Sequence, residues 1–258
     1  MRRFHAYTIG VPRSGSHSIS NMFETSFHCA HEPWAEETIK LVLANGQGEL
    51  NSTQLREHLL RRDSAAKFEM EATHFMHFFV SELVDLFPHS KYVLTVRDPM
   101  QWIQSVINQN IVTSQPRFAI WQTLEAYTYG RYGFDTPKPE RKLGAIPNVW
   151  PLAAYFKNWA EHNQTVLNAV PKSRLMLLET ADIQNFAGTL CKFLGSEINP
   201  GLLNMSKSHS GQGNDNLEAV AEKRIDVFSY VDVSYVNAII DEYCQPVIDR
   251  LRAFFCTG

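Results

Sequence analysis

The chain has 258 residues, of which 44% are hydrophobic and 20% are charged, and its net charge at pH 7 is -3. These proportions exclude an intrinsically disordered chain, and the length suits a single α/β domain that buries a sheet between layers of helices. The slight negative charge also argues against a nucleic-acid-binding protein, which is usually more basic.

The cysteines and the hydropathy pattern bear on the compartment. The chain has four scattered cysteines that lack the spacing of metal ligands: Cys29, Cys191, Cys244 and Cys256. We expect them to be buried free thiols, which fit a reducing compartment. The sequence has no run of 18 apolar residues, and the apolar run behind the basic residues 1–3 is too short for a signal peptide. We therefore expect a cytoplasmic protein with no membrane span.

The first expected elements enclose a short loop. Residues 6–11 form an apolar run typical of a buried strand, a loop rich in Pro, Gly and Ser follows, and apolar residues recur at helical spacing from Ile19 to Phe27. This order is the layout of a phosphate-binding loop, because backbone N–H groups and the positive end of the helix dipole both face an anion. An ordinary strand–turn–helix corner, with the serines as helix caps, is the alternative.

The following segments alternate between strand and helix patterns. Further strands are expected at residues 26–33, 66–71, 91–96 and 174–180. Helices are expected from Pro33, from a cap at Ser52 or Thr53 to about Arg62, and at 74–87 (capped by Thr73), 99–111, 151–170, 182–194 and 233–255, the last kinked at Pro246. Such alternation predicts a parallel sheet covered by helices on both faces.

Residues 113–150 break this alternation. They combine tryptophans and tyrosines with prolines and glycines, which predicts an irregular segment that is either a lid over a ligand or an insertion packed on the surface. We favour the lid, because the segment directly follows the helix expected at 99–111.

The loop at residues 10–17 can be compared with the nucleotide-binding pattern G-x-x-x-x-G-K-[ST]. Gly10 and Gly15 occupy the two glycine positions, but Ser16 and His17 stand where the Lys and the Ser/Thr belong. The anion-binding geometry is therefore kept without the magnesium hydroxyl, and the basic residue lies within the loop as Arg13. Because the chain as a whole is not basic, a phosphorylated ligand has to be held by a few such arginines and by backbone N–H groups.

A second motif follows the strand at residues 91–96. That strand runs into Arg97-Asp98-Pro99, and Ser105 lies eight residues beyond Arg97 on the next expected helix. The two motifs together resemble the sulfotransferases that use 3′-phosphoadenosine 5′-phosphosulfate (PAPS), which carry P-[RK]-S-G-[ST]-[ST] after their first strand and R-[DN]-P followed by a serine later. Weaker matches, in the same order along the chain, are Phe-Pro at 87–88, the run from Trp159 to Leu178, and Phe-Leu-Gly at 193–195.

The resemblance covers about residues 6–33 and 66–195, and it implies a single sulfotransferase domain over residues 1–258 with a P-loop-like architecture. It implies PAPS as the sulfuryl donor, its product 3′-phosphoadenosine 5′-phosphate (PAP), and no metal. The residues it implies for donor binding are Arg13, Ser14, Gly15, Ser16, His17, Ser18, Arg97 and Ser105. The loop would hold the 5′-phosphosulfate, and Arg97 with Ser105 would hold the 3′-phosphate. The polar loop at 207–213 matches the family weakly.

The resemblance implies three catalytic residues: Arg13, Glu32 and His74. Arg13 would neutralise the charge that develops as the sulfuryl group leaves. Two residues compete as general base. Glu32, in Glu-Pro, matches the position of a catalytic Glu in some bacterial and carbohydrate sulfotransferases, and His74 resembles the catalytic His of cytosolic ones, although Ala72 replaces a Lys there. We favour Glu32.

The acceptor is open at this point: a hydroxyl or amine of a small-molecule, carbohydrate or lipid-like compound fits the aromatic segment. Two other functions compete with sulfuryl transfer. A small-molecule kinase would need a loop Lys and a magnesium ligand, and neither is visible. The other is a relative that binds nucleotide without catalysis. Arg13→Ala and Glu32→Ala separate it from an enzyme, because the catalytic assignment is wrong if neither change affects turnover or cofactor binding.

Overall fold

The computed structural model describes residues 2–195, 199–205 and 224–255. The chain forms two compact units, one of residues 1–96 and 163–211 and the other of residues 97–162 and 212–258. The weakly matching loop at 207–213 and Cys256 lie outside the described residues. That residues 1–258 form a single domain stays a prediction.

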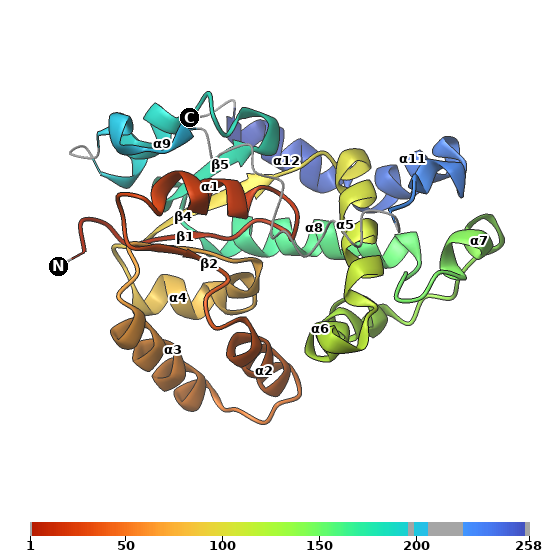
Figure 1. The fold of residues 1–258 in the computed structure, drawn as a ribbon, viewed down its shortest axis with the longest axis horizontal. Helices are drawn as coiled ribbons and strands as arrows, with labels where there is room; N and C mark the ends of the chain where they lie inside the picture. Colours follow the sequence, from red (N-terminus) through yellow and green to blue (C-terminus); the bar gives the residue numbers. More distant parts are fainter. Residues whose placement is uncertain (1, 196–198, 206–223, 256–258) are drawn as a thin grey trace. The chain divides into compact units, whose positions relative to one another are not determined.

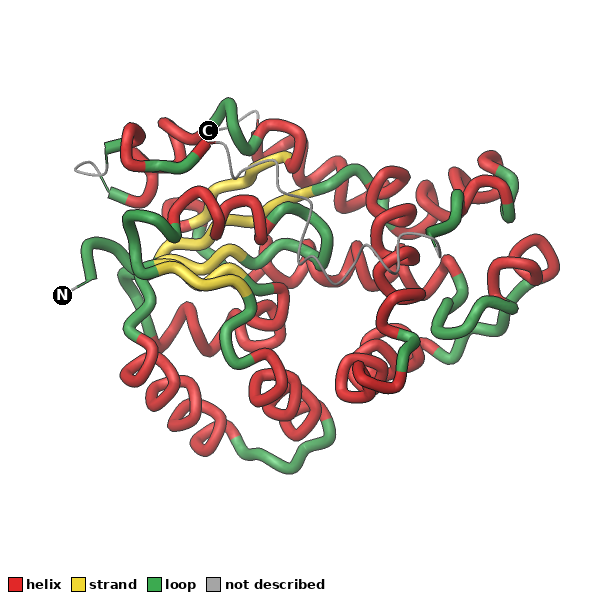
Figure 2. Tube along the Cα trace, in the orientation of Figure 1, coloured by secondary structure: helices red, strands yellow, loops and turns green. Residues whose placement is uncertain are grey.

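The first unit is built on a five-stranded parallel sheet (Figures 1 and 2). Its strands are β1 (Ala6–Thr8), β2 (Cys29–His31), β3 (Met70–Ala72), β4 (Lys91–Val96) and β5 (Leu175–Glu179). They lie in the order β2-β3-β1-β4-β5. From β1 the chain moves to one side of the sheet to form β2, whereas β4 and β5 extend the other side. Ligands of open parallel sheets bind at such a switch point, beyond the carboxyl ends of the strands.

Helices cover both faces of this sheet, as the alternating pattern predicts (Figure 1). On one face lie α1 (Ser16–Phe23) and α9 (Ala187–Leu194), and on the other lie α3 (Ser52–Ala66) and α4 (Val80–Leu86). The α1 side has a continuous apolar core that includes Ala6, Ile19, Met22, Phe23, Met70, Val93, Leu178, Leu190 and Leu194, all less than 5% exposed. Burial of these side chains is what fixes α1, and with it the loop that precedes α1.

One expected helix start in this unit is wrong, and another is confirmed with a different type of helix. Helix α3 is capped by Asn51, which accepts a hydrogen bond from Gln54 N and completes a capping box, so Ser52 is already helical. Thr73 does act as a cap, but for a 3-10 helix (His74–Phe79), and α4 begins only at Val80. Helix α2 (Ala35–Gly46) follows Pro33 as expected.

The second unit is helical where the structure describes it. It contains α5 (Pro99–Thr113), α6 (Ala119–Tyr129), α7 (Arg141–Gly144), the first part of α8 (Leu152–Ala169), α11 (Val233–Tyr243) and α12 (Gln245–Phe255). The expectation of an irregular segment at 113–150 is wrong in part, since it contains α6 and α7. The helix expected at 233–255 is interrupted at Cys244, because Pro246 has no N–H to donate to the preceding turn.

No helix within the described ranges is long and apolar enough to span a membrane.

Candidate active site

The loop after β1 is held by close packing against β4. A Cβ on Gly10 would lie 2.1 Å from Thr95 Oγ1, so only glycine fits at this position. The buried Ser14 hydroxyl donates to the carbonyl of Val11 (2.6 Å) and lies 2.7 Å from Thr95 Oγ1. Thr180, after β5, donates to the carbonyl of Ser14. The Ser14 hydroxyl is therefore engaged within the protein, where it fixes the shape of the loop.

The loop has a backbone suited to an anion. Arg13 (φ 68°) and Gly15 (φ 107°) both adopt left-handed conformations, and alternation of this kind turns successive N–H groups toward one point. Helix α1 begins directly after Gly15, with no side-chain hydrogen bond capping its N-terminus. The loop and the helix N-terminus thus fit a phosphate or phosphosulfate group.

Glu32 and His74, the two competing bases, form a hydrogen-bonded pair. Glu32 lies immediately after β2 and His74 two residues after β3, and these parallel neighbours pair up to His31 and Ala72. Glu32 Oε1 lies 2.9 Å from His74 Nδ1. Parallel strands bring their carboxyl ends to one edge of the sheet, so the two residues meet although 42 positions separate them.

Two further histidines complete this group. His31 Nε2 lies 3.3 Å from Ser16 Oγ and 4.0 Å from Glu32 Oε1. The His17 ring packs edge-on against the His31 ring, with centroids 4.7 Å apart. The start of α1 and the end of β2 therefore meet through Ser16, His17 and His31, which brings the predicted donor loop next to the predicted base.

Burial and charge set the protonation of this cluster. Burial raises the pKa of the Glu32 carboxyl, but the hydrogen bond and the charge of His74 outweigh it, so the pKa lies below its usual value. Burial lowers the pKa of His31 to about 4 and also lowers the pKa of His17. At neutral pH the carboxylate of Glu32 is ionised and these two imidazoles are uncharged.

Arg97 and Ser105 belong to the second unit. Arg97 connects β4 to α5, is half-buried, and accepts a hydrogen bond at its carbonyl from Trp159 Nε1 (3.2 Å). Burial lowers the pKa of its guanidinium, which still leaves it charged. Ser105 lies on α5, whose first turn is fixed by Pro99 and by the cap of Asp98 on Gln101 N (3.0 Å).

Comparison with known proteins identifies the family. A family model described as "Sulfotransferase domain" matches residues 8–202, which include every site residue named above. The chain belongs to the sulfotransferase domain family. It is also 30% identical over 105 residues to "Ava biosynthesis cluster protein M" of Aspergillus versicolor. That match covers 38% of this chain and only 40% of the relative's length.

Solved structures agree on the fold. The sulfotransferase STF9 of Mycobacterium avium superposes with a TM-score of 0.50 at 10% identity, over 95% of this chain and 77% of that one. A sulfotransferase of Alicyclobacillus acidocaldarius gives a TM-score of 0.44 at 13% identity, over 92% and 100% of the two chains. The five-stranded parallel sheet, the family match and the superposition on STF9 confirm the expected parallel α/β fold of P-loop-like sulfotransferase type.

Within this sulfotransferase domain the structure joins most of the predicted site residues and adds others. Ser14, Gly15, Ser16, His17, His31, Glu32 and His74 gather in the first unit, where Ser18 also lies, on α1. Sequence reasoning missed Thr95 and Thr180, which shape the loop. Thr95 lies next to the last residue of the strand expected at 91–96, and Thr180 ends the strand expected at 174–180, so their position at the carboxyl ends of strands is the signal that could have pointed to them. Among the residues that the structure describes, no group of three or more His, Cys, Asp or Glu is arranged to hold a metal ion.

Proposed function

We propose that the protein transfers a sulfuryl group from PAPS to a hydroxyl or amine of a small organic acceptor. The observation that carries this proposal is the Glu32–His74 pair at 2.9 Å, joined through His31 to Ser16 of the anion-binding loop. A base next to the loop that holds the leaving phosphate is what in-line transfer requires. PAPS supplies the activated sulfuryl group; the acceptor oxygen or nitrogen replaces the bridging oxygen at sulfur, and PAP leaves.

Glu32 accepts the proton of the acceptor, and His74 is its hydrogen-bond partner. The carboxylate of Glu32 is ionised at neutral pH, and His74 Nδ1 donates the hydrogen bond that Glu32 Oε1 accepts. Because the two side chains share a hydrogen bond, the choice between them becomes a division of roles between proton acceptor and hydrogen-bond partner. Glu32 remains the residue that we assign as the base.

Arg13 and the loop support departure of the phosphate. Arg13 is exposed and has a left-handed backbone conformation. Its positive charge stabilises the negative charge that develops on the bridging oxygen as the sulfuryl group is transferred. Backbone N–H groups at the start of α1, with Ser16, His17 and Ser18, make up the rest of this binding loop. Arg97 and Ser105 are assigned to the 3′-phosphate on their motif alone, since a charged fork and a hydroxyl suit such a group.

The test is a transfer assay with labelled donors. Purified protein is incubated with ³⁵S-labelled PAPS and a panel of phenols, alcohols, sugars and amines, and in parallel with γ-³²P-ATP and magnesium. Label transferred from PAPS, with none from ATP, is the expected result. Transfer from ATP alone would replace sulfuryl transfer by the kinase function. Binding of PAP without turnover on any acceptor class would favour a non-catalytic relative.

A further inference from the structure

The turn that carries Glu32 is strained. Glu32 (φ 47°) and Trp34 (φ 53°) both adopt left-handed conformations, although neither is a glycine. Glu32 also precedes a proline, which favours an extended conformation for that residue. Such a backbone persists only where its surroundings hold it in place. Contacts from α3 and from β3 hold residues 32–34 in this conformation.

One side chain from α3 contacts this turn twice. Arg62 Nη2 donates to the carbonyl of Pro33 (3.0 Å), and the Arg62 guanidinium lies 5.2 Å from the centre of the Trp34 ring. Trp34 also packs on Phe68, with centroids 5.9 Å apart, although it remains 46% exposed. Phe68 precedes β3 whereas Glu32 follows β2, so the Trp34 side chain is directed back along the sheet, away from the strand ends.

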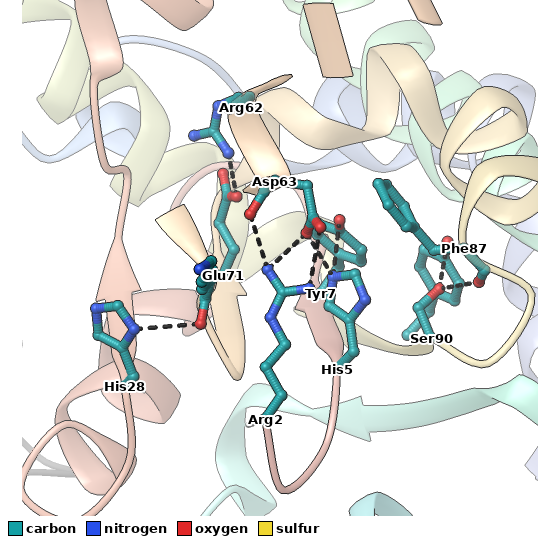
Figure 3. Close-up of polar contacts among 11 residues, drawn as sticks. Arg2, His5, Tyr7, His28, Arg62, Asp63, Glu71, Phe87 and Ser90 are labelled. Carbon is teal, nitrogen blue, oxygen red and sulfur yellow. Dashed lines mark hydrogen bonds and ion pairs between the residues drawn. The ribbon is translucent and has the colours of Figure 1, made fainter. Parts of the chain in front are cut away.

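Arg62 is itself fixed by a buried acid. Its Nη1 forms an ion pair with Glu71 Oε2, and Glu71 on β3 is 4% exposed (Figure 3). The neighbouring Asp63 is bound by both terminal nitrogens of Arg2, at 2.7 and 3.0 Å, and lies 3.3 Å from His5 Nε2 (Figure 3). These pairs tie the last turns of α3 to the sheet, so Arg62 reaches the turn from a rigid base.

The strand β3 links the two ends of this arrangement. Glu71 holds Arg62, the next residue Ala72 accepts a hydrogen bond from Glu32 N (3.1 Å), and His74 lies two residues further on. The backbone of Glu32 is thus held on β3 from one side, and the carbonyl that follows it is held by Arg62 from the other.

We propose that Arg62, fixed by Glu71, is a positioning residue that holds the turn at residues 32–34 and so keeps the Glu32 carboxylate on His74. The proposal rests on the proposed function only in calling Glu32 a base; the placement of its carboxylate can be measured without turnover. Arg62 touches no reacting atom and acts through the turn.

The test compares two variants with a matched control. Arg62→Met removes the donor to Pro33 and leaves the buried Glu71 without its partner, which lowers the melting temperature. The double variant Arg62→Met/Glu71→Gln removes both buried charges, so it recovers the melting temperature but still lacks the contact with the turn. Arg56→Met, also on α3, removes only a 3.9 Å surface pair with Asp85.

Three measurements separate positioning from folding: kcat with labelled PAPS, the melting-temperature shift caused by PAP, and titration of the Glu32 carboxyl carbon by ¹³C NMR, assigned with Glu32→Gln. In both Arg62 variants kcat falls roughly ten- to hundredfold, as expected for a misplaced catalytic group. The Glu32 titration moves to higher pH because the His74 contact is loosened, and PAP still binds, since the loop is intact. Arg56→Met matches the wild type throughout.

Recovery of kcat and of the wild-type titration in the double variant would overturn the proposal and leave Arg62 a purely structural role. An unchanged titration in Arg62→Met would do the same. If Arg62→Met does not fold, Arg62→Lys replaces it, because this variant keeps the ion pair with Glu71 but lacks the guanidinium fork. A Glu32 titration that moves to higher pH in Arg62→Lys supports the proposal, and an unchanged titration overturns it. If the wild type transfers no label, the proposed function fails, while the titration still decides whether Arg62 places Glu32.

Discussion

At the scale of single residues, the site is one ionised carboxylate among imidazoles. Burial raises the pKa of the Glu32 carboxyl, but the hydrogen bond from His74 and the charge of His74 outweigh burial and keep that pKa below its usual value. His31 in turn remains uncharged because it is buried against Ser16 and the His17 ring. The site therefore holds an ionised carboxylate beside His17 and His31, which are uncharged at neutral pH.

Replacement of the base tests the role of Glu32. Glu32→Gln keeps the shape of the side chain but removes the proton acceptor, so kcat should fall by about 10²–10⁴-fold, the usual contribution of a general base. PAP binding, measured by calorimetry, should remain, because the loop is unchanged. Glu36→Gln, on an exposed position of α2, is the matched control. Equal activity of the two variants would contradict the assignment of Glu32 as the base.

His31 predicts how stability depends on pH. Its pKa is about 4 in the folded state against an ordinary value of 6.5, so between these pH values the unfolded chain binds a proton that the folded chain does not. The free energy of unfolding should therefore fall as the pH drops from 6.5 toward 4, by up to roughly 3 kcal/mol from this residue.

His31→Gln removes that contribution. Urea unfolding curves at pH 7 and pH 4.5 should show a smaller loss of stability in the variant than in the wild type. His5, whose pKa burial also lowers to about 4, keeps a residual dependence in both proteins. An unaltered difference between the two pH values would mean that His31 already titrates normally in the folded protein.

The sequence pointed to Glu32 and His74 as two competing candidates for the general base, but not to their contact. Glu32 and His74 follow separate strands, and each could be found from its local motif. Their contact depends on β2 lying beside β3 with His31 opposite Ala72, which no local pattern encodes. The role of Arg62 was also beyond the sequence, because an arginine in a polar helix is ordinarily a solvated side chain.

At the scale of elements, the anion loop depends on the strand behind it. Gly10 lies so close to β4 that a methyl group there would overlap both the side chain and the backbone of Thr95. Gly188, near the start of α9, has open space around the same position. One glycine is thus required by packing and the other is not.

Two alanine substitutions should therefore act in opposite directions. Gly10→Ala should lower the free energy of unfolding by about 3 kcal/mol or more, because the backbone atom of Thr95 cannot move aside cheaply. Gly188→Ala should raise it by about 0.5–1 kcal/mol, as alanine favours the helix. Denaturant unfolding of both variants measures this difference. A Gly10→Ala protein as stable as the wild type would show that the loop does not pack on Thr95.

The existence of elements was more predictable than their ends. Helical apolar periodicity located α1, α5, α8 and α9, each of which buries one face, and short strand patterns located the five strands. The α3 start was misplaced because Asn51, Ser52 and Thr53 are all good caps, and only Asn51 is paired with a Gln three residues on. The aromatic, proline and glycine content of residues 113–150 led to the expectation of an irregular segment, yet Ala119–Tyr129 form the helix α6.

At the scale of the whole molecule, strand–helix alternation was sufficient to predict a parallel sheet with helices on both faces. It could not predict the order β2-β3-β1-β4-β5, because strand order depends on contacts between residues far apart in sequence. Nor does it separate the chain into its two compact units. The donor-binding assignment of Arg13, in the first unit, and of Arg97, in the second, rests on their sequence motifs alone.

Ligand-linked stability tests that assignment on the intact protein. PAP at about 100 times its dissociation constant should raise the free energy of unfolding by roughly 2.7 kcal/mol, which corresponds to roughly 5–10 °C in melting temperature for a chain of this size. Arg13→Ala and Arg97→Ala should each reduce the shift, and Arg56→Ala should not, because its surface pair with Asp85 is remote from both motifs in sequence. ATP with magnesium should give no shift, since it lacks a 3′-phosphate. A shift with ATP that PAP does not produce would return the loop at residues 10–17 to the kinase hypothesis, whereas loss of the PAP shift only in Arg13→Ala would remove Arg97 from the binding residues.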